Sequence, residues 1–326
     1  MNNPPSVPPA IPPSIDRREW LTLAGAGLAA VAARPTSAPA QIPTGQFFPG
    51  FRNERIETSG ATINAVIGGQ GPPVLLLHGA PQSHISWRLV APRLAEDYTV
   101  VAADLRGYGD SSKPEGLPDH SNYSKRNMAL DQVEVMRHFG FDTFALIGQD
   151  RGGRVTHRLL LDHPGVVTRA AVMDIVPAYY LYNHVTLEFI QAYFHWFQYV
   201  RPTPIPEDVL VEQYAARAAS DRELTPAQAE YQRTNQNREG AHAMCEDYRA
   251  SASIDLVHDA ADIDRKVDIP LRVLWADGGS MDRIYDVLGI WQERGTQVTG
   301  RAMPGGHNMQ EGAPDEVLAE IRALLA

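Results

Sequence analysis

A strand–turn–helix unit near the middle of the chain constrains the fold more than any other stretch. The apolar run 144–147 predicts a buried strand, and residues 154–161 predict a helix. Between them lies the small-residue turn Gly148-Gln149-Asp150-Arg151-Gly152-Gly153. Such a turn strains one residue so that its side chain stands clear at the helix N-terminus, and its neighbours must be small to avoid clashes. The pattern predicts an exposed nucleophile at Asp150.

An aspartate in this place narrows the chemistry. A serine that attacked a saturated carbon would leave an ether, which water does not readily cleave. A carboxylate that attacked the same carbon would leave an ester, which water can hydrolyse. Asp150 therefore indicates displacement at an sp³ carbon, followed by hydrolysis of the ester.

The chain around this turn alternates between strand and helix patterns. Strands are predicted at 63–67, 74–78, 98–104, 170–174 and 271–275, and helices at 87–94, 127–139 and 313–325. This alternation predicts an α/β fold with a mostly parallel, doubly wound sheet. It stops between 176 and 258, so we expect a helical cap there, inserted after the sixth strand into a core formed by 45–175 and 259–326.

Composition excludes several classes of function. The 326-residue chain is 44% hydrophobic and 21% charged, which is typical of a soluble globular protein. Its net charge is −10 and it has no long basic run, so we expect no nucleic-acid partner. Cys245 is the single cysteine, which excludes an intramolecular disulfide and a cysteine-based metal site.

Residues 1–44 do not have the pattern of a folded domain. A Pro-rich start is followed by Arg17-Arg18, a mild apolar run at 21–33 and the small-residue segment Ala38-Pro39-Ala40. This order resembles a twin-arginine export signal, and the run is too short to span a bilayer. We expect export to the periplasm with no membrane association of the mature chain. The alternative is a disordered N-terminal tail on a cytoplasmic protein.

Ligand sites of open α/β sheets lie outside the carboxyl ends of the strands. The loops that follow the predicted strands are therefore the ones to search. They supply His78-Gly79-Ala80-Pro81, Asp104, the turn at Asp150, Asp174, Asp277 and His307. His307 precedes the last helix and is the candidate general base, since the imidazole pKa lies near neutrality. Asp174 and Asp277 are both candidates for its acid partner.

Two arginines flank the predicted nucleophile and indicate the substrate class. Arg151 and Arg154 place positive charge beside the reacting carbon, and guanidinium groups bind carboxylates in bidentate fashion. Cations are unfavourable at a helix start, so a purely structural role is less expected for them. The substrate should therefore be a 2-halo acid anchored by its carboxylate.

Several separated motifs together resemble one family. They are His78-Gly79-Ala80-Pro81-Gln82, Asp104-Leu105-Arg106-Gly107-Tyr108-Gly109, Asp150-Arg151-Gly152-Gly153-Arg154, Met173-Asp174-Ile175-Val176-Pro177, His195-Trp196, Cys245-Glu246-Asp247-Tyr248-Arg249-Ala250 and Gly306-His307. Over residues 45–326 the chain resembles the fluoroacetate (haloacetate) dehalogenases of the α/β-hydrolase superfamily. The resemblance implies an eight-stranded α/β-hydrolase fold with a helical cap, a small halo acid substrate, and no metal or organic cofactor. It also suggests a homodimer.

The resemblance also implies roles for individual residues. Asp150 would be the nucleophile and His307 the base, and the family pattern favours Asp174 over Asp277 as the acid. Arg151 and Arg154 would hold the substrate carboxylate. Three cap residues would donate hydrogen bonds to the departing halide, and two backbone amides would stabilise the oxyanion of ester hydrolysis. These are His195, Trp196 and Tyr248 for the halide, and Ala80 and Arg151 for the oxyanion.

Two positions depart from the family pattern, and two other functions compete. Ala80 stands where phenylalanine is common, so we expect a larger pocket that favours larger 2-halo acids, and Gln149 replaces the usual histidine.

An epoxide hydrolase shares the aspartate nucleophile but needs two cap tyrosines, here Tyr248 with Tyr179, Tyr180 or Tyr193; Arg151 argues against it. A non-enzymatic small-molecule receptor is the other alternative, against which the intact Asp150 and His307 argue.

Overall fold

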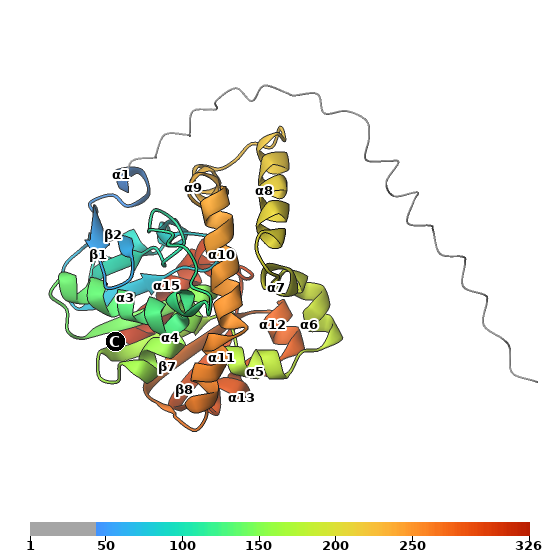
Figure 1. Ribbon diagram of the computed structural model, residues 1–326. Coiled ribbons are helices and arrows are strands. Elements are labelled where there is room, and N and C mark those ends of the chain that lie inside the picture. The colour runs from blue at the N-terminus through green and yellow to red at the C-terminus, as the bar shows by residue number, and fades with distance from the viewer. Residues whose placement is uncertain (1–43) are drawn as a thin grey trace, which may run out of the picture. The chain divides into compact units, whose positions relative to one another are not determined.

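The computed structural model describes residues 44–326 of the chain (Figure 1). The expected export signal lies in residues 1–43, outside the described residues. Within residues 44–326, no helix combines the length and the apolar character needed to cross a membrane.

One eight-stranded sheet forms the centre of the fold. Its spatial order is β1-β2-β4-β3-β5-β6-β7-β8, with β1 and β2 antiparallel to their neighbours and all pairings from β4 to β8 parallel. The mostly parallel α/β sheet predicted from the sequence is confirmed. The strands are β1 (Arg52–Glu57), β2 (Thr62–Gly68), β3 (Pro73–Leu77), β4 (Thr99–Ala103), β5 (Phe144–Gln149), β6 (Val167–Met173), β7 (Val267–Ala276) and β8 (Gly295–Met303).

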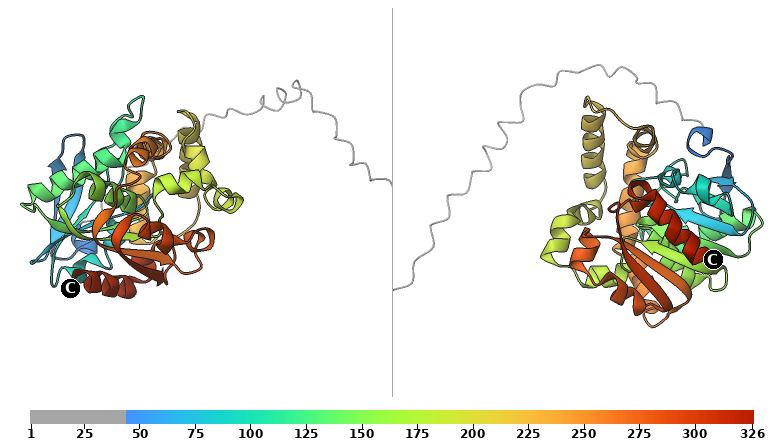
Figure 2. Two further views of the ribbon diagram at one scale, coloured as in Figure 1. Left: turned by 90° about the horizontal axis from the view of Figure 1, so that it is seen from below. Right: turned by 180° about the vertical axis from the view of Figure 1, so that it is seen from behind.

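Helices cover both faces of the sheet, and the strand side chains alternate between them. Leu75 and Leu77 of β3 belong to one buried cluster, which includes side chains of α3 (Lys125–His138) and α4 (Arg151–Asp162). Val74 and Leu76 belong to a second cluster with α15 (Pro314–Leu325) on the opposite face (Figures 1 and 2). Burial on both faces explains the almost unbroken apolar runs in the central strands.

The single helix predicted over 87–94 is wrong. The structure has a 3₁₀ turn, η1 (His84–Trp87), and a separate short helix, α2 (Ala91–Leu94). Pro92 lacks an N–H and its ring would clash with the carbonyl of Arg88, so one continuous helix does not form. The remaining elements of the core are α1 (Thr44–Phe47), η2 (Ser121–Tyr123), α12 (Ser280–Ile284), α13 (Val287–Gln292) and α14 (Met309–Gly312).

A run of helices separates β6 from β7 in the sequence. In Figure 1 these helices lie beside the sheet, with α8 extending next to α10. They are α5 (Ala178–Asn183), α6 (Leu187–Ala192), α7 (Phe194–Tyr199), α8 (Ile205–Ala218), α9 (Pro226–Asn235), α10 (Arg238–Ser251) and α11 (Ile254–Ala261). We call this segment the cap. It contributes one wall of the cavity described below.

Candidate active site

The turn between β5 and α4 holds Asp150 in a strained conformation. Its φ and ψ angles are 46° and −113°, a combination that residues other than glycine rarely adopt. A Cβ on Gly148 would lie 2.4 Å from the Gly152 carbonyl oxygen, and one on Gly152 would lie 2.7 Å from that of His78. The glycines therefore allow the close approach that directs the carboxylate of Asp150 into the cavity described below, where the side chain is largely buried rather than exposed.

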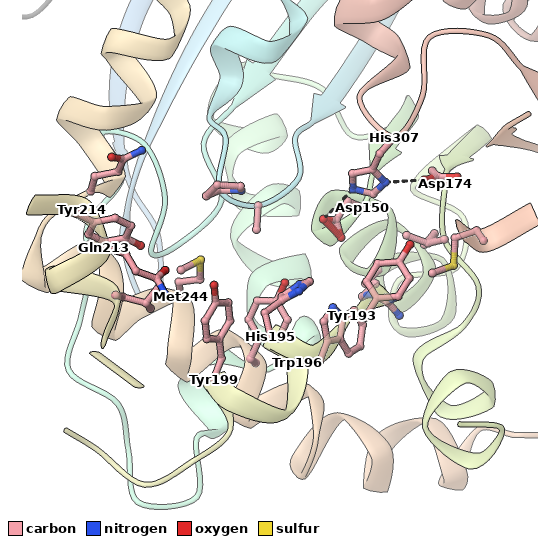
Figure 3. Close-up of a pocket in the computed structure, with 18 of the residues that line it drawn as sticks. Asp150, Asp174, Tyr193, His195, Trp196, Tyr199, Gln213, Tyr214, Met244 and His307 are labelled. Carbon is pink, nitrogen blue, oxygen red and sulfur yellow. Dashed lines mark hydrogen bonds and ion pairs between the residues drawn. The ribbon is translucent and has the colours of Figure 1, made fainter. Parts of the chain in front are cut away.

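Asp150, His307 and Asp174 lie next to one another at the carboxyl ends of the strands, with His307 in contact with both carboxylates (Figure 3). His307 Nε2 is 3.5 Å from Asp150 Oδ2, and Nδ1 is 2.5 Å from Asp174 Oδ2. The other oxygen of Asp174 accepts the Ala276 backbone N–H at 2.9 Å. Asp277, the alternative acid, is exposed, and its backbone N–H donates to the Met303 carbonyl. Geometry thus brings Asp174 rather than Asp277 to the imidazole.

The charges of this group depend on one another. Burial favours the neutral imidazole, but the carboxylates of Asp150 and Asp174 outweigh it and raise the pKa of His307 to about 10. Burial opposes ionisation of Asp150 as well, yet His307 and the nearby Arg151 and Arg154 lower its pKa. The resting arrangement is therefore an ionised carboxylate beside an imidazolium.

Gln149, for which the sequence offered no role, contacts the loop that carries His307. Its Nε2 donates to the His307 backbone carbonyl at 3.1 Å, and its Oε1 accepts from Gln310 Nε2 at 3.5 Å. The side chain is fully buried. Gln149 therefore ties the nucleophile turn to the base loop, 158 residues further along the chain.

Arg154 presents a guanidinium to the cavity. Its Nη1 donates to the Val176 carbonyl at 3.2 Å, whereas its buried Nε has no hydrogen-bond partner among residues 44–326. The guanidinium carbon lies 4.8 Å from the ring centre of Trp196. Burial, and then the neighbouring Arg151, lower the pKa of Arg154. The carboxylate of a bound ligand would stabilise the charged guanidinium and so counteract both the burial and the repulsion from Arg151.

Arg151 is less available than the sequence predicted. Its side chain is fully buried, and it donates from Nε to Asp247 Oδ2 at 2.7 Å and from Nη2 to Ser251 Oγ at 2.8 Å. Its guanidinium carbon lies 4.2 Å from the ring centre of Tyr248, and it is not among the side chains that line the cavity. Only Nη1 is left without a partner in the described part of the chain.

Asp247 links the core to the cap. Besides Arg151, it accepts hydrogen bonds from the hydroxyl of Tyr108 at 2.6 Å and from the ammonium of Lys125. The cationic partners outweigh the burial of Asp247 and hold its pKa well below the ordinary value. Sequence reasoning gave Asp247 no role, although it lies in one of the motifs that carried the resemblance, because its partners are distant in sequence.

His195, Trp196 and Tyr248, which we call the cap trio, lie together on the cavity wall. The ring centre of Tyr248 is 5.9 Å from that of His195 and 5.4 Å from that of Trp196. No side-chain polar atom of the three has a hydrogen-bond partner within residues 44–326. Burial lowers the pKa of His195 and raises that of Tyr248, so the phenol keeps its proton. The trio therefore offers unused donors to a ligand.

The two predicted oxyanion donors lie on adjoining segments. The Gly152 backbone N–H donates to the His78 carbonyl at 2.9 Å, which holds the turn that carries Ala80 against the start of α4. The backbone N–H groups of Ala80 and Arg151 have no partner within the described chain, and Ala80 lines the cavity. Both amides are free to bind an anionic oxygen.

These parts surround one cavity of about 370 Å³. Asp104 is not among its lining residues; its carboxylate binds the ring and backbone of His84. Tyr179 and Tyr180 are not among them either, whereas Tyr193 is. Sequence reasoning missed a further part of the wall, on α7, α8, the end of α9 and the middle of α10, because none of these residues belongs to a motif. This part consists of Tyr199, Leu210, Gln213, Tyr214, Arg217, Gln236 and Met244.

Comparisons with known proteins agree with this architecture. Residues 72–314 match the model of the alpha/beta hydrolase fold family. The chain is 41% identical to fluoroacetate dehalogenase from Burkholderia sp, over 86% of this chain and 95% of that protein. It is 33% identical to soluble epoxide hydrolase from Corynebacterium sp. (strain C12), over 80% and 92%. A solved structure from Nostoc sp PCC 7120, suggested to be an alpha/beta hydrolase, shares 46% identity over 85% and 98%, with a TM-score of 0.81.

Proposed function

The chain belongs to the alpha/beta hydrolase fold family, and we propose that it hydrolyses the carbon–halogen bond of haloacetates and related 2-halo acids. The main support is that Asp150, His307 and Asp174 line the same cavity as Arg154. The Nε of Arg154 has no hydrogen-bond partner among residues 44–326 and is therefore available to a substrate. The 41% identity to fluoroacetate dehalogenase supports this choice of reaction.

The proposed first step is displacement at C2. Arg154 binds the substrate carboxylate and offsets its repulsion from Asp150, and the buried charge of Arg151 behind the cavity wall adds to this offset. Asp150 Oδ attacks C2 in line with the carbon–halogen bond, and the halide leaves with the bonding electrons. The cap trio donates hydrogen bonds to the halide as its charge develops, which matters most for fluoride because it is a poor leaving group.

The proposed second step is hydrolysis of the aspartyl ester. Once Asp150 is esterified it is no longer charged, so one of the two groups that raise the pKa of His307 is gone. The imidazole can then lose its proton and, oriented by Asp174, take a proton from water. The water attacks the ester carbonyl, and the backbone amides of Ala80 and Arg151 bind the oxyanion. The bond between the carbonyl carbon and the substrate oxygen then breaks, His307 returns its proton to the departing oxygen, and a 2-hydroxy acid leaves the restored carboxylate of Asp150.

Incubation with fluoroacetate, chloroacetate and 2-chloropropionate tests this proposal. We expect stoichiometric release of halide and of glycolate or lactate. Release of chloride without fluoride would keep the mechanism and limit the substrates to better leaving groups. Release of neither halide from any of the acids would contradict the proposal.

Epoxide opening is the second candidate, and one observation favours it. Tyr193 and Tyr248 both line the cavity that contains Asp150, so two phenols are present for protonation of an epoxide oxygen. The buried guanidinium of Arg154 has no evident task in that reaction. Diol formation from an epoxide, with no halide release, would favour this candidate, and a ligand-induced thermal shift without turnover would favour a receptor.

A further inference from the structure

The cavity is larger than a haloacetate requires. Its volume of about 370 Å³ corresponds to roughly twelve water molecules at about 30 Å³ each, whereas a haloacetate has only five non-hydrogen atoms. Figure 3 shows Asp150, His307 and Asp174 at one end, and Gln213 and Tyr214 at the other. The reaction centre therefore occupies only part of the space.

The middle of the cavity is apolar. Met244 and the ring of Tyr199 lie between the two ends in Figure 3, Leu210 is a further apolar lining residue, and the ring of Tyr214 borders this part at the outer end. Leu210 and Met244 are buried, and burial raises the pKa of both tyrosines, so their side chains stay neutral. These walls suit a hydrocarbon chain better than a charged group.

The outer end is polar and carries unused hydrogen-bonding groups. Gln213 lies there in Figure 3, and Arg217 follows it by one turn on the same face of α8; both line the cavity and are exposed to solvent. Gln236 lines the cavity as well, and none of the three side chains has a hydrogen-bond or ion-pair partner among residues 44–326. Gln236 Oε1 is itself buried without a partner. The carboxylates that line the cavity, Asp150 and Asp174, both lie at the opposite end, so the charge of Arg217 is not neutralised within the cavity.

We infer that the substrate is a 2-halo acid with an extended substituent on C2 that ends in a second carboxylate. This inference rests on the proposed function, since Arg154 and Asp150 keep their roles at C1 and C2. The hydrocarbon part of the substituent packs in the middle of the cavity, and Arg217 binds the far carboxylate. The overall reaction converts the 2-halo diacid and water into a 2-hydroxy diacid, a halide ion and a proton.

The test compares two substrates of equal chain length. Halide release is followed with 2-chlorohexanedioate and 2-chlorohexanoate, and chloroacetate reports on the reaction centre in the same preparation. We expect kcat/KM for the diacid to exceed that for the monoacid by about fivefold, the factor that corresponds to about 1 kcal/mol, the upper end for an exposed ion pair.

Two substitutions at one position and a matched control sharpen this test. Arg217→Ala should remove the preference for the diacid, and Arg217→Glu should reverse it towards 6-amino-2-chlorohexanoate, whose far end is cationic. Arg222→Ala removes the same charge from an exposed part of the cap that does not line the cavity, so it should keep the preference.

The outcomes separate this inference from the function on which it rests. Turnover of chloroacetate with equal kcat/KM for diacid and monoacid would overturn the inference and leave the dehalogenase proposal standing. A diacid preference that survives Arg217→Ala, or is lost equally in Arg222→Ala, would also overturn it. Absence of halide release from all three acids would contradict both proposals.

Discussion

The two walls of the cavity are held in different ways. The core wall is fixed by hydrogen bonds to the sheet: the Asp174 backbone N–H donates to the Leu274 carbonyl at 2.7 Å, and that of Asp150 donates to the Met173 carbonyl at 3.1 Å. The cap wall is joined to the core through Asp247 of α10, but the side chains of the cap trio themselves are held by contacts between rings, such as Trp196 against Phe189, with centres 5.8 Å apart, and against Tyr248. The polar side-chain atoms of the cap trio have no hydrogen-bond partner among residues 44–326.

This difference suits the two walls to different tasks: the core wall to the reaction and the cap wall to the choice of substrate. A nucleophile and a base must keep their geometry, and backbone hydrogen bonds of a sheet supply that rigidity. Ring contacts define a shape and leave the donors free for a leaving group. The chain's similarity to both a dehalogenase and an epoxide hydrolase is consistent with a common core wall and a cap wall that selects the substrate.

Removing the nucleophile should have the largest effect. Asp150→Asn keeps the shape of the side chain but lacks the anionic oxygen that attacks C2. We expect halide release to fall by at least about 10⁴-fold for every acid, more than for any cap substitution. Steady-state halide assays on fluoroacetate and chloroacetate measure this. Full activity in Asp150→Asn would show that the core wall does not supply the attacking atom.

Replacing the base should stop the reaction after its first step. In His307→Ala the ester forms but is not hydrolysed, so steady-state turnover should fall about 10²–10⁴-fold. Rapid-mixing experiments should show a burst of about one halide per active site, and mass spectrometry should find the acyl group on Asp150. Unchanged turnover, or a variant without any burst, would argue against separate roles for these two residues.

The acid partner of His307 can be identified by a matched pair of substitutions. Asp174→Asn removes the carboxylate 2.5 Å from Nδ1 and should lower turnover about 10²-fold, the lower end of the contribution of a general base. Asp277→Asn makes the same change on an exposed side chain and should have little effect. A larger loss in Asp277→Asn would reverse this assignment.

A cap substitution should affect one halide more than the other. Tyr248→Phe removes a hydroxyl that has no partner in the described structure. We expect kcat to fall about a hundredfold with fluoroacetate and about tenfold with chloroacetate, because fluoride depends more on hydrogen bonding as it leaves. Chloroacetate serves as the internal control. Equal losses for the two substrates would indicate a packing role.

The last prediction concerns the pKa of His307 rather than the rate of the reaction. Neutralising Asp150 removes a charge that raises the pKa of His307, so the pKa should fall from about 10 in the wild type towards the ordinary value near 6.5 in Asp150→Asn. Asp150 is also uncharged in the wild-type ester intermediate, so ester hydrolysis by the wild type should speed up as pH rises through a similarly lowered pKa of His307. NMR titration of the imidazole in both proteins measures the change. An unchanged pKa would show that Asp150 and His307 are not coupled.

The sequence predicted the part of the site that follows from topology. Strand ends of a parallel sheet meet at one edge, so Asp150, Asp174 and His307 could be placed together from their positions after strands. The same reasoning did not find β1, whose sequence is largely polar and whose one buried residue is Ile56. An edge strand with a single buried side chain carries too little hydrophobic pattern.

The rest of the site depends on contacts that local sequence does not encode. Arg151 points to Asp247, 96 residues away, and Gln149 contacts the loop of His307. The Arg-rich start of α4 predicted carboxylate binding, but only packing against α10 decides which arginine reaches the cavity. The lining residues of α8 belong to no recognised motif, so no sequence pattern placed them in the site.

One isotope experiment tests the central claim most directly. A single turnover of chloroacetate in ¹⁸O-labelled water, with enzyme in excess, should give unlabelled glycolate and place the label in the carboxylate of Asp150. This follows because the hydroxyl oxygen of the product comes from Asp150, and water then restores the carboxylate. Labelled glycolate from the first turnover, with no label in the peptide that contains Asp150, would mean that water attacks C2 directly and would contradict the account.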